Sequence, residues 1–251
     1  MDGWILAVFL LSVLVGSYVQ AVTGFAMGMI VIAVMVGAHL VDVPLIAAVA
    51  SLLSLSNVVI ALRGQLHHVH LRLFGWLALG QLSAIWLGVA LLDYLNVSAL
   101  WILEVLLGAF TALGGLSMLL RPEAKTRVSR PWACFSAGVG AGVVGGLFSA
   151  SGPVMGWFNY RQPLEVAEIR ATLFGCFAVS TATRTLVVGV DGGLTQDVWL
   201  LTLFGLPVVV FGTWAGRELA PPVSSEVMKR LASGMLVSTG VWILVNALLN
   251  R

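Results

Sequence analysis

Hydrophobic residues fill long runs of this chain, and short polar connections separate the runs. The apolar segments cover approximately residues 4–36, 44–62, 73–92, 98–120, 131–160, 171–190, 197–216 and 229–249. Six of them are about 20 residues long, the length of one helix across a hydrocarbon layer of ~30 Å. Uninterrupted apolar runs of this length recur along the whole sequence, so the pattern predicts an all-α polytopic membrane protein.

Two segments, 4–36 and 131–160, are too long for a single crossing. Both contain glycines and small polar residues near the middle, where a spanning helix would ordinarily contain leucine. The sequences at these points are QAVTGFAMG (20–28) and GGLFSASGP (145–153). A segment of about 30 residues can make two short helices that meet near the middle of the membrane, but it is too long for one span. Each segment therefore predicts a broken helical hairpin.

The two predicted breaks lie 125 residues apart, which is half of the chain. At nearly the same shift, Gly80 matches Gly205 and Gly88 matches Gly212. Ordered matches near one shift indicate an internal duplication. We expect a first membrane repeat over residues 1–120, a basic linker over 121–130 and a second repeat over 131–251.

The basic residues of the loops predict how the two repeats are oriented. If segment 131–160 turns back, all Lys and Arg of the connecting loops fall on one side, and only Arg251 falls on the other. If the segment crosses once, these residues are divided between both sides. The positive-inside rule favours the first arrangement. Each repeat is then a hairpin plus three transmembrane helices, and the second repeat is inverted. A plain bundle of eight spans is the alternative.

Composition narrows the classes of function. The chain is 59% hydrophobic and 10% charged, with a mean hydropathy of +1.02. No polar stretch is long enough for a soluble domain, and the basic residues lie in short loops, so no nucleic-acid partner is expected. The start, Met1-Asp2-Gly3-Trp4, lacks the basic region of a removable signal peptide. Cys134 and Cys176 lie in apolar segments and are expected as core residues.

Enzyme and metal signatures are weak. The sequence contains no HExxH or G-x-S-x-G motif and no aspartate pair on a spanning helix, which disfavours an intramembrane enzyme. His67, His68 and His70 form an HHxH cluster that could bind a metal, but a position beside the membrane favours a plain basic loop. We expect no cofactor, no metal and no catalytic residue.

The breaks themselves are the first candidate binding site. Backbone that leaves a helix inside the membrane must be satisfied by protein or by a water-filled cavity. Pro153 suits the first turn of a restarted helix, whose free N–H groups favour an anion. The alternative is that these small residues only permit close helix packing. The candidates are Gln20, Thr23, Gly24 and Phe25 in the first break, and Ser149, Ser151, Gly152 and Pro153 in the second.

Arg184 is the second candidate, because it lies well inside segment 171–190. A cation at that depth should face a cavity or a partner. Thr181 lies one turn earlier on the same face, and Asn57 is its counterpart in the first half. A guanidinium binds sulfonate or carboxylate through paired donors. The alternatives are an arginine that reaches the interface or one that pairs with Glu104. Arg170 could attract anions at the cytoplasmic mouth, although positive-inside anchoring explains it equally well.

Several stretches together resemble a known family. QAVTGFAMGM (20–29), SNVVIALRG (56–64), GLFSASGP (146–153) and EIRATLFGCFAVSTATR (168–184) are similar to the TauE/SafE sulfite-exporter family, also called the toluene sulfonate uptake permease family. The resemblance covers essentially the whole chain. It implies a transporter of the bacterial inner membrane for small anions such as sulfite, sulfoacetate or other organosulfonates.

The chain departs from the family pattern at both breaks. The second break of the family reads more like G-x-x-G-x-G-G-P, and here Ser149 and Ser151 replace two glycines. Ala26 replaces a glycine expected in the first break. Added hydroxyls change the chemistry of the site, and less accessible backbone changes its shape.

The sequence therefore predicts a secondary transporter of small sulfur-containing or organic anions that works by alternating access. An anion channel or a non-transporting membrane subunit is the alternative. The expected partners are a small anionic substrate and the lipid bilayer of a bacterial inner membrane, with the basic loops cytoplasmic. The identity of the anion, the direction of transport, a proton or sodium coupling ion and a homodimeric assembly stay open.

Overall fold

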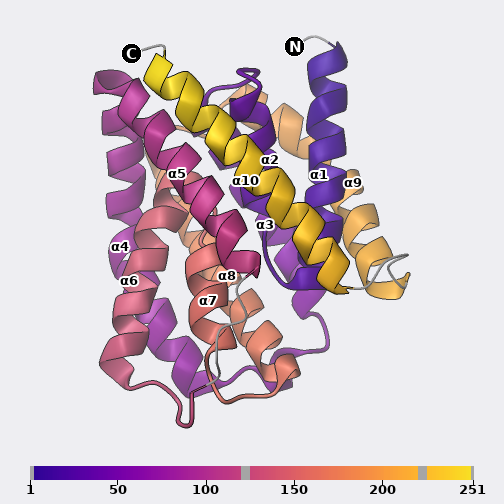
Figure 1. The fold of residues 1–251 in the computed structure, drawn as a ribbon, viewed down its shortest axis with the longest axis vertical. Coiled ribbons are helices and arrows are strands. Elements are labelled where there is room, and N and C mark those ends of the chain that lie inside the picture. The colour runs from indigo at the N-terminus through magenta and orange to yellow at the C-terminus, as the bar shows by residue number, and fades with distance from the viewer. Residues whose placement is uncertain (1–2, 120–124, 220–224, 250–251) are drawn as a thin grey trace.

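A computed structural model describes residues 3–119, 125–219 and 225–249 (Figure 1). Arg121 and Arg251, which entered the charge argument, lie outside the described residues. The described chain is helical throughout, with no strand among these residues. Its elements are α1 (Gly3–Thr23), α2 (Met27–Gly37), α3 (Val43–Leu62), the 3-10 turn η1 (Leu66–His68), α4 (Leu71–Ser98), α5 (Leu100–Leu119), α6 (Pro131–Phe148), α7 (Gly152–Tyr160), α8 (Val166–Val190), α9 (Gln196–Glu218) and α10 (Ser225–Leu249).

Eight of these helices are long and apolar enough to cross a membrane. They are α1, α3, α4, α5, α6, α8, α9 and α10, and each contains a window of 18 residues with high hydropathy and few charges. The prediction of an all-α polytopic membrane protein is confirmed.

Helix breaks occur inside both of the overlong segments, at the residues that the glycines and prolines indicate. α1 ends at Thr23 and α2 begins at Met27, while α6 ends at Phe148 and α7 begins at Gly152. The arms are unequal, because α1 has 21 residues and α6 has 18, but α2 has 11 and α7 has 9. The expectation of two short helices per segment is therefore wrong for α1 and α6. α1 and α6 are apolar up to the break, and no residue within them ends the helix earlier.

The helices alternate in direction along the chain. In Figure 1, α1, α3, α5, α7 and α9 run downward, and α2, α4, α6, α8 and α10 run upward, so both termini lie at the top. The turn between α1 and α2 is therefore the lower tip of a hairpin that opens upward. The turn between α6 and α7 is the upper tip of a hairpin that opens downward.

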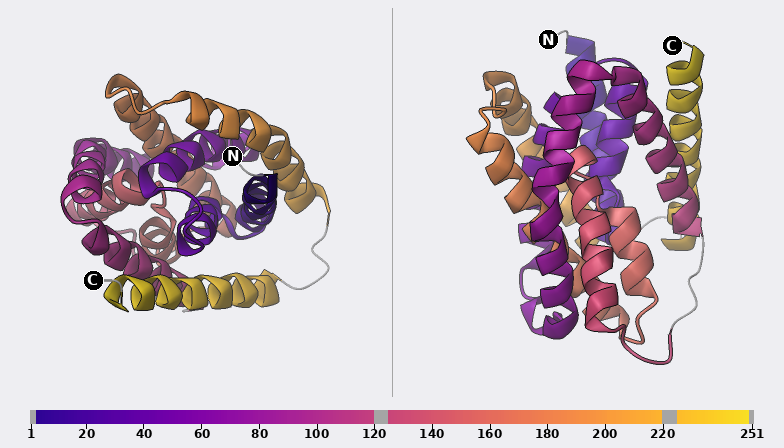
Figure 2. Two further views of the ribbon diagram at one scale, coloured as in Figure 1. Left: turned by 90° about the horizontal axis from the view of Figure 1, so that it is seen from above. Right: turned by 90° about the vertical axis from the view of Figure 1, so that its left-hand side faces the viewer.

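Helix packing pairs the two halves of the chain. α4 packs on α6, and correspondingly α9 packs on α1; α4 also contacts α8 as α9 contacts α3. The pairs α3–α8 and α5–α10 join helices that stand at the same place in the order of each half, and Figure 2 shows α10 lying along the outside of the bundle.

Glycines permit the close crossings between these helices. A Cβ on Gly80 or Gly88 of α4 would collide with the backbone of α6, and a Cβ on Gly212 of α9 would collide with Ser17 of α1. Gly108 of α5 contacts Gly240 of α10 in the same way. Small residues at such crossings are the usual packing device of membrane helices, because they let two backbones approach.

Local signals fix where the helices begin. Pro44, Pro131 and Pro153 stand in the first turns of α3, α6 and α7, where the missing N–H of proline has no intrahelical partner to lose. Glu165 and Glu168 form a capping box at the start of α8. Of the HHxH cluster, His70 caps α4 by accepting the N–H of Leu73 on its Nδ1 at 3.2 Å. Cys134 and Cys176 are both buried and free.

Candidate functional site

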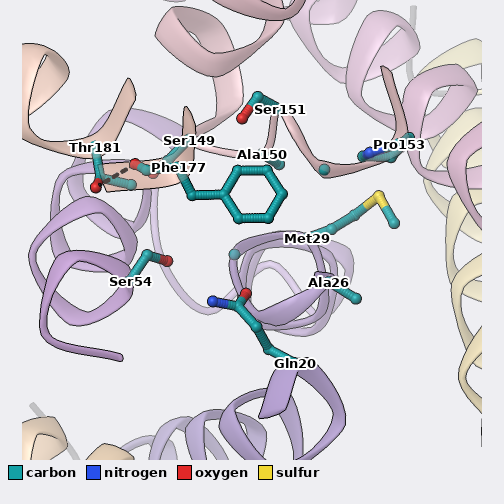
Figure 3. Close-up of a pocket in the computed structure, with 12 residues that line it drawn as sticks. Gln20, Ala26, Met29, Ser54, Ser149, Ala150, Ser151, Pro153, Phe177 and Thr181 are labelled. Carbon is teal, nitrogen blue, oxygen red and sulfur yellow. Dashed lines mark hydrogen bonds between the residues drawn. The ribbon is translucent and has the colours of Figure 1, made fainter. Parts of the chain in front are cut away.

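The two breaks meet around a small cavity in the middle of the bundle (Figure 3). α3 and α8 complete its wall. Its volume is about 30 Å³, which is room for one or two water molecules. The lining residues are Gln20, Ala26, Gly28, Met29, Ser54, Ser149, Ala150, Ser151, Gly152, Pro153, Phe177 and Thr181.

The second break presents backbone and hydroxyl groups to this cavity. Ser149 ends α6 in the left-handed conformation, with φ at 50°, and its N–H bonds the carbonyl of Gly145 at 2.9 Å. Ser151 is the N-cap of α7 but makes no side-chain cap, so its hydroxyl does not occupy the free N–H groups of the first turn. The start of α7 therefore offers donors and the positive end of a helix dipole to the cavity.

The first break is closed by its own side chains. The Thr23 hydroxyl lies 2.8 Å from the carbonyl oxygens of both Val19 and Phe25. The first N–H of α2, on Met27, donates to Oε1 of Gln20 at 3.0 Å. Because Gln20 takes this donor, α2 lacks the open N-terminus that α7 has.

Two consecutive hydrogen bonds between buried side chains hold Gln20 in place. Its Nε2 donates to Oδ1 of Asn57 at 2.7 Å, and Nδ2 of Asn57 donates to the hydroxyl of Thr213 at 2.7 Å. The three residues come from α1, α3 and α9 and are all buried. Asn57 therefore orients Gln20 and does not itself line the cavity.

Arg184 lies behind the cavity wall and is 1% exposed. Its Nε donates to the carbonyl of Gly146 at 2.9 Å, and its Nη1 donates to the carbonyl of Ala47 and to Oγ of Ser51, both at 2.9 Å. Nη2 is buried without a hydrogen-bond partner among the described residues. In this conformation the protein thus occupies two of the three guanidinium nitrogens, and one donor group stays free.

Arg170 lies at the other end of α8 and does not line the cavity. Its Nη2 donates to the carbonyl of Ala21 at 2.6 Å, and the Tyr160 hydroxyl donates to the carbonyl of Thr23 at 3.3 Å. Both carbonyls belong to the last turn of α1, where no intrahelical N–H remains to satisfy them. In this conformation Arg170 caps the first break.

Half of the residues predicted for the site meet in the cavity. They are Gln20, Ser149, Ser151, Gly152, Pro153 and Thr181. The others lie around it, and they are Thr23, Gly24, Phe25, Asn57, Arg170 and Arg184. The Phe25 side chain, for example, packs against Gly152 and Gly156 on α7.

Sequence reasoning missed several lining residues. Ser54 was visible as the neighbour of Asn57 one turn away, but it was not predicted to bind substrate. Met29 and Phe177 gave no signal, because an apolar residue in a spanning helix does not reveal which face it occupies. Figure 3 shows the Phe177 ring projecting toward the centre of the lining residues, with the Thr181 hydroxyl bonded to the Phe177 carbonyl at 2.7 Å.

Comparison with known proteins agrees with the resemblance seen in the sequence. The family described as "Sulfite exporter TauE/SafE" matches residues 8–243, which is nearly the whole chain. The chain belongs to the TauE/SafE sulfite exporter family. It is therefore a multi-pass membrane protein of a transporter family.

Two relatives illustrate the family. The "Probable sulfite/organosulfonate exporter TauE" of Cupriavidus necator is 39% identical over 233 residues, covering 93% of this chain and 91% of that protein. The "Probable inner membrane transporter protein TsaS" of Comamonas testosteroni is 27% identical over 140 residues, covering 54% of this chain and 57% of that protein. No solved structure matches the chain.

Proposed function

We propose that this protein is a secondary transporter of small sulfur-containing or organic anions, such as sulfite, sulfoacetate or another organosulfonate. The site is the cavity between the two breaks, and transport proceeds by alternating access. No catalytic reaction is assigned to the chain. The name of the Cupriavidus necator relative, an exporter of sulfite and organosulfonate, supports this class of substrate.

The observation that carries the proposal is the open start of α7 at the cavity. Its first turn has no side-chain cap, and Ser149 and Ser151 stand beside it. Arg184 lies directly behind, with one guanidinium nitrogen unpartnered in the part of the chain that the structure describes. Helix N-termini, hydroxyls and guanidinium groups are all hydrogen-bond donors that stabilise an oxyanion. The Asp and Glu side chains are absent from the cavity lining, which disfavours a cation.

We infer that the two halves are inverted repeats, over residues 1–120 and 131–251. The opposite directions of the two hairpins support this inference, as do the matched pairs α4–α6 and α9–α1. Binding sites of such transporters lie between repeats, where half-helices end near the middle of the membrane. The cavity has this location relative to α2 and α7.

The size of the cavity favours a carrier over a channel. A volume of about 30 Å³ holds one or two waters and excludes an organosulfonate. Entry of the anion therefore requires the two breaks to separate. A protein that opens its site in this way is a carrier, whereas a channel needs a continuous pore.

The proposed location is a bacterial inner membrane, with the connections that follow α3, α5, α7 and α9 in the cytoplasm. The basic loop residues of the charge argument lie in these connections or near the helix ends beside them, as the positive-inside rule requires. The printed name of the Comamonas testosteroni relative, an inner membrane transporter, supports the compartment. A proton or a sodium ion as the coupling ion and a homodimer are compatible with this proposal.

Transport by purified protein in proteoliposomes tests the proposal. We expect saturable uptake of labelled sulfite or sulfoacetate, and acceleration of uptake when unlabelled anion is present on the other side of the membrane. Arg184→Ala should abolish uptake while the protein still inserts and purifies. The matched control is Arg217→Ala, because Arg217 also donates to a backbone carbonyl, that of Ile60 at 2.7 Å, but lies at an exposed helix end.

Three results would contradict the proposal. Uptake that never saturates and shows no exchange indicates a channel. A purified chain that moves no solute indicates a silent subunit. Full transport by folded Arg184→Ala removes the anion site assigned here.

A further inference from the structure

A buried serine connects Arg184 to the cavity. Ser51 of α3 is completely buried and does not line the cavity, whereas Ser149 does. Oγ of Ser51 lies 2.9 Å from Nη1 of Arg184 on one side and 2.8 Å from Oγ of Ser149 on the other. The three polar groups therefore form a line from the buried charge to the cavity wall.

The number of protons on each group indicates which of the three residues donates and which accepts. Nη1 of Arg184 has two protons, one for the carbonyl of Ala47 and one for Oγ of Ser51. Ser51 therefore accepts from the arginine and has one proton to donate. Two acceptors are in reach, the carbonyl of Ala47 at 3.0 Å and Oγ of Ser149 at 2.8 Å. The Ala47 carbonyl already accepts from Arg184 and, as a helix carbonyl, from the main-chain N–H one turn further on. Ser149 is the less crowded acceptor.

We propose that Ser51 is a positioning residue that relays the charge of Arg184 to Ser149, and that Ser149 is the donor to the anion. When Ser51 donates to Ser149, the proton of Ser149 is free to point into the cavity. All the donors then point one way, from guanidinium to Ser51, to Ser149, to the oxyanion. Hydrogen bonds in such a chain polarise one another, and the first of them is charge-assisted. This inference rests on the proposed transport of anions.

The relay explains how a charge without access to the cavity can act on a ligand there. Nε and Nη1 of Arg184 are engaged by the protein, and the side chain is 1% exposed. The charge can therefore stay buried, and only the proton of Ser149 has to turn into the cavity to meet an anion.

The backbone of Ser149 agrees with a role for its hydroxyl. Its φ of 50° lies in the left-handed region, which glycine adopts without strain and which costs other residues free energy. A glycine would end α6 at this point more easily. The hydroxyl is what serine adds there, and its only hydrogen-bond partner among the described residues is Ser51.

Binding of sulfite and sulfoacetate to the purified full chain tests the relay, in a double-mutant cycle of Ser51→Ala and Ser149→Ala. Each single variant should bind about 10-fold more weakly, the effect expected for loss of one hydrogen bond to a charged group. The double variant should bind no more weakly than Ser149→Ala, within about twofold, because both residues act through one donor. Ser51→Thr keeps the hydroxyl and should restore most of the affinity.

Ser56→Ala is the matched control. Ser56 lies on the same helix, bonds the carbonyl of Leu52 at 3.1 Å and does not line the cavity, so the substitution should leave affinity unchanged. The thermal midpoint of each variant without anion separates a loss of fold from a loss of binding.

The outcomes separate the relay from the function on which it rests. Effects of Ser51→Ala and Ser149→Ala that multiply in the double variant would show two independent hydroxyls and overturn the relay. Unchanged affinity of folded Ser51→Ala would overturn it as well, while anion binding by the wild-type protein would keep the proposed function. No anion binding by the wild-type protein would overturn both.

Discussion

The two breaks end their first helices in the same way. The carbonyls of Ala21 and Gly146 lie 125 residues apart in the sequence, which is the shift expected between the two proposed repeats. Each accepts an N–H from an arginine of α8, Ala21 from Arg170 at 2.6 Å and Gly146 from Arg184 at 2.9 Å. One helix therefore caps both broken helices, and Arg170 is half-buried where Arg184 is fully buried.

The breaks differ in how the second helix starts. Gln20 occupies the first N–H of α2, and Thr23 bonds the backbone of its own turn. No side chain caps α7, and its flanking serines face the cavity. The comparison supports the proposal that the first break is a structural support and the second is the ligand site. In the proposed duplication, both halves keep the same way of ending the first helix, and only the second half keeps donors free for a substrate.

The largest effect on stability is expected when the first break loses its cap. Gln20→Leu leaves the Met27 N–H and Oδ1 of Asn57 buried without partners, and each unsatisfied group costs about 1–3 kcal/mol. We expect the free energy of unfolding to fall by roughly 3 kcal/mol, measured by titration with a denaturing detergent.

Gln81→Leu is the matched control for that substitution. Gln81 is also completely buried, but its amide has no hydrogen-bond partner within the described part of the chain. This variant should be as stable as the wild type or more stable. An equal loss of stability in both variants would show that the cap contributes nothing specific.

The contact between the two breaks gives the next largest effect. A Cβ on Gly28 would lie 2.6 Å from the carbonyl oxygen of Ser149, and that oxygen belongs to backbone, which cannot rotate away. Gly28→Ala should therefore force the breaks apart and lower stability by about 2 kcal/mol, within the usual range for overpacking. Gly140→Ala on α6, where a Cβ meets nothing within 4 Å, should be neutral or slightly stabilising. Unchanged stability of Gly28→Ala would mean that the breaks do not touch as described.

A smaller effect of opposite sign is expected at Ala26. Its φ of 107° is strained for any residue with a Cβ. Relief of roughly 2 kcal/mol of strain exceeds the ~0.8 kcal/mol lost with one buried methyl group. Ala26→Gly should thus stabilise the protein by about 1 kcal/mol. Ala33→Gly, inside α2, should destabilise it by a similar amount, and a loss at both positions would contradict the assignment of strain to the first break.

The sequence was sufficient to predict the breaks but not the partners that hold them. Glycine and small polar residues clustered in the middle of an overlong apolar segment interrupt a helix, so both turns were found within a few residues, whereas the single Pro207 lies inside the continuous helix α9. Arg184 was recognisable because a charge inside a spanning segment needs a partner. Which groups it contacts depends on how α3, α6 and α8 pack, and packing is not readable from one chain. The roles of Arg170 and Ser51 could not be predicted for the same reason, because they arise only from contacts between elements far apart in the sequence.

Anion affinity of Arg184→Ala and Arg170→Ala tests the difference between the breaks most directly. Both variants remove an arginine of α8 that caps a broken helix, so both should lose stability. In the proposed site only Arg184 supplies charge to the cavity, so sulfite and sulfoacetate should bind folded Arg184→Ala at least 100-fold more weakly, an effect of the size expected for a buried charged donor. Affinity of Arg170→Ala should stay within about threefold of the wild type, since its loss removes no donor from the cavity. Equal losses of affinity in the two variants, or a larger loss in Arg170→Ala, would contradict the assignment of the anion site to the second break.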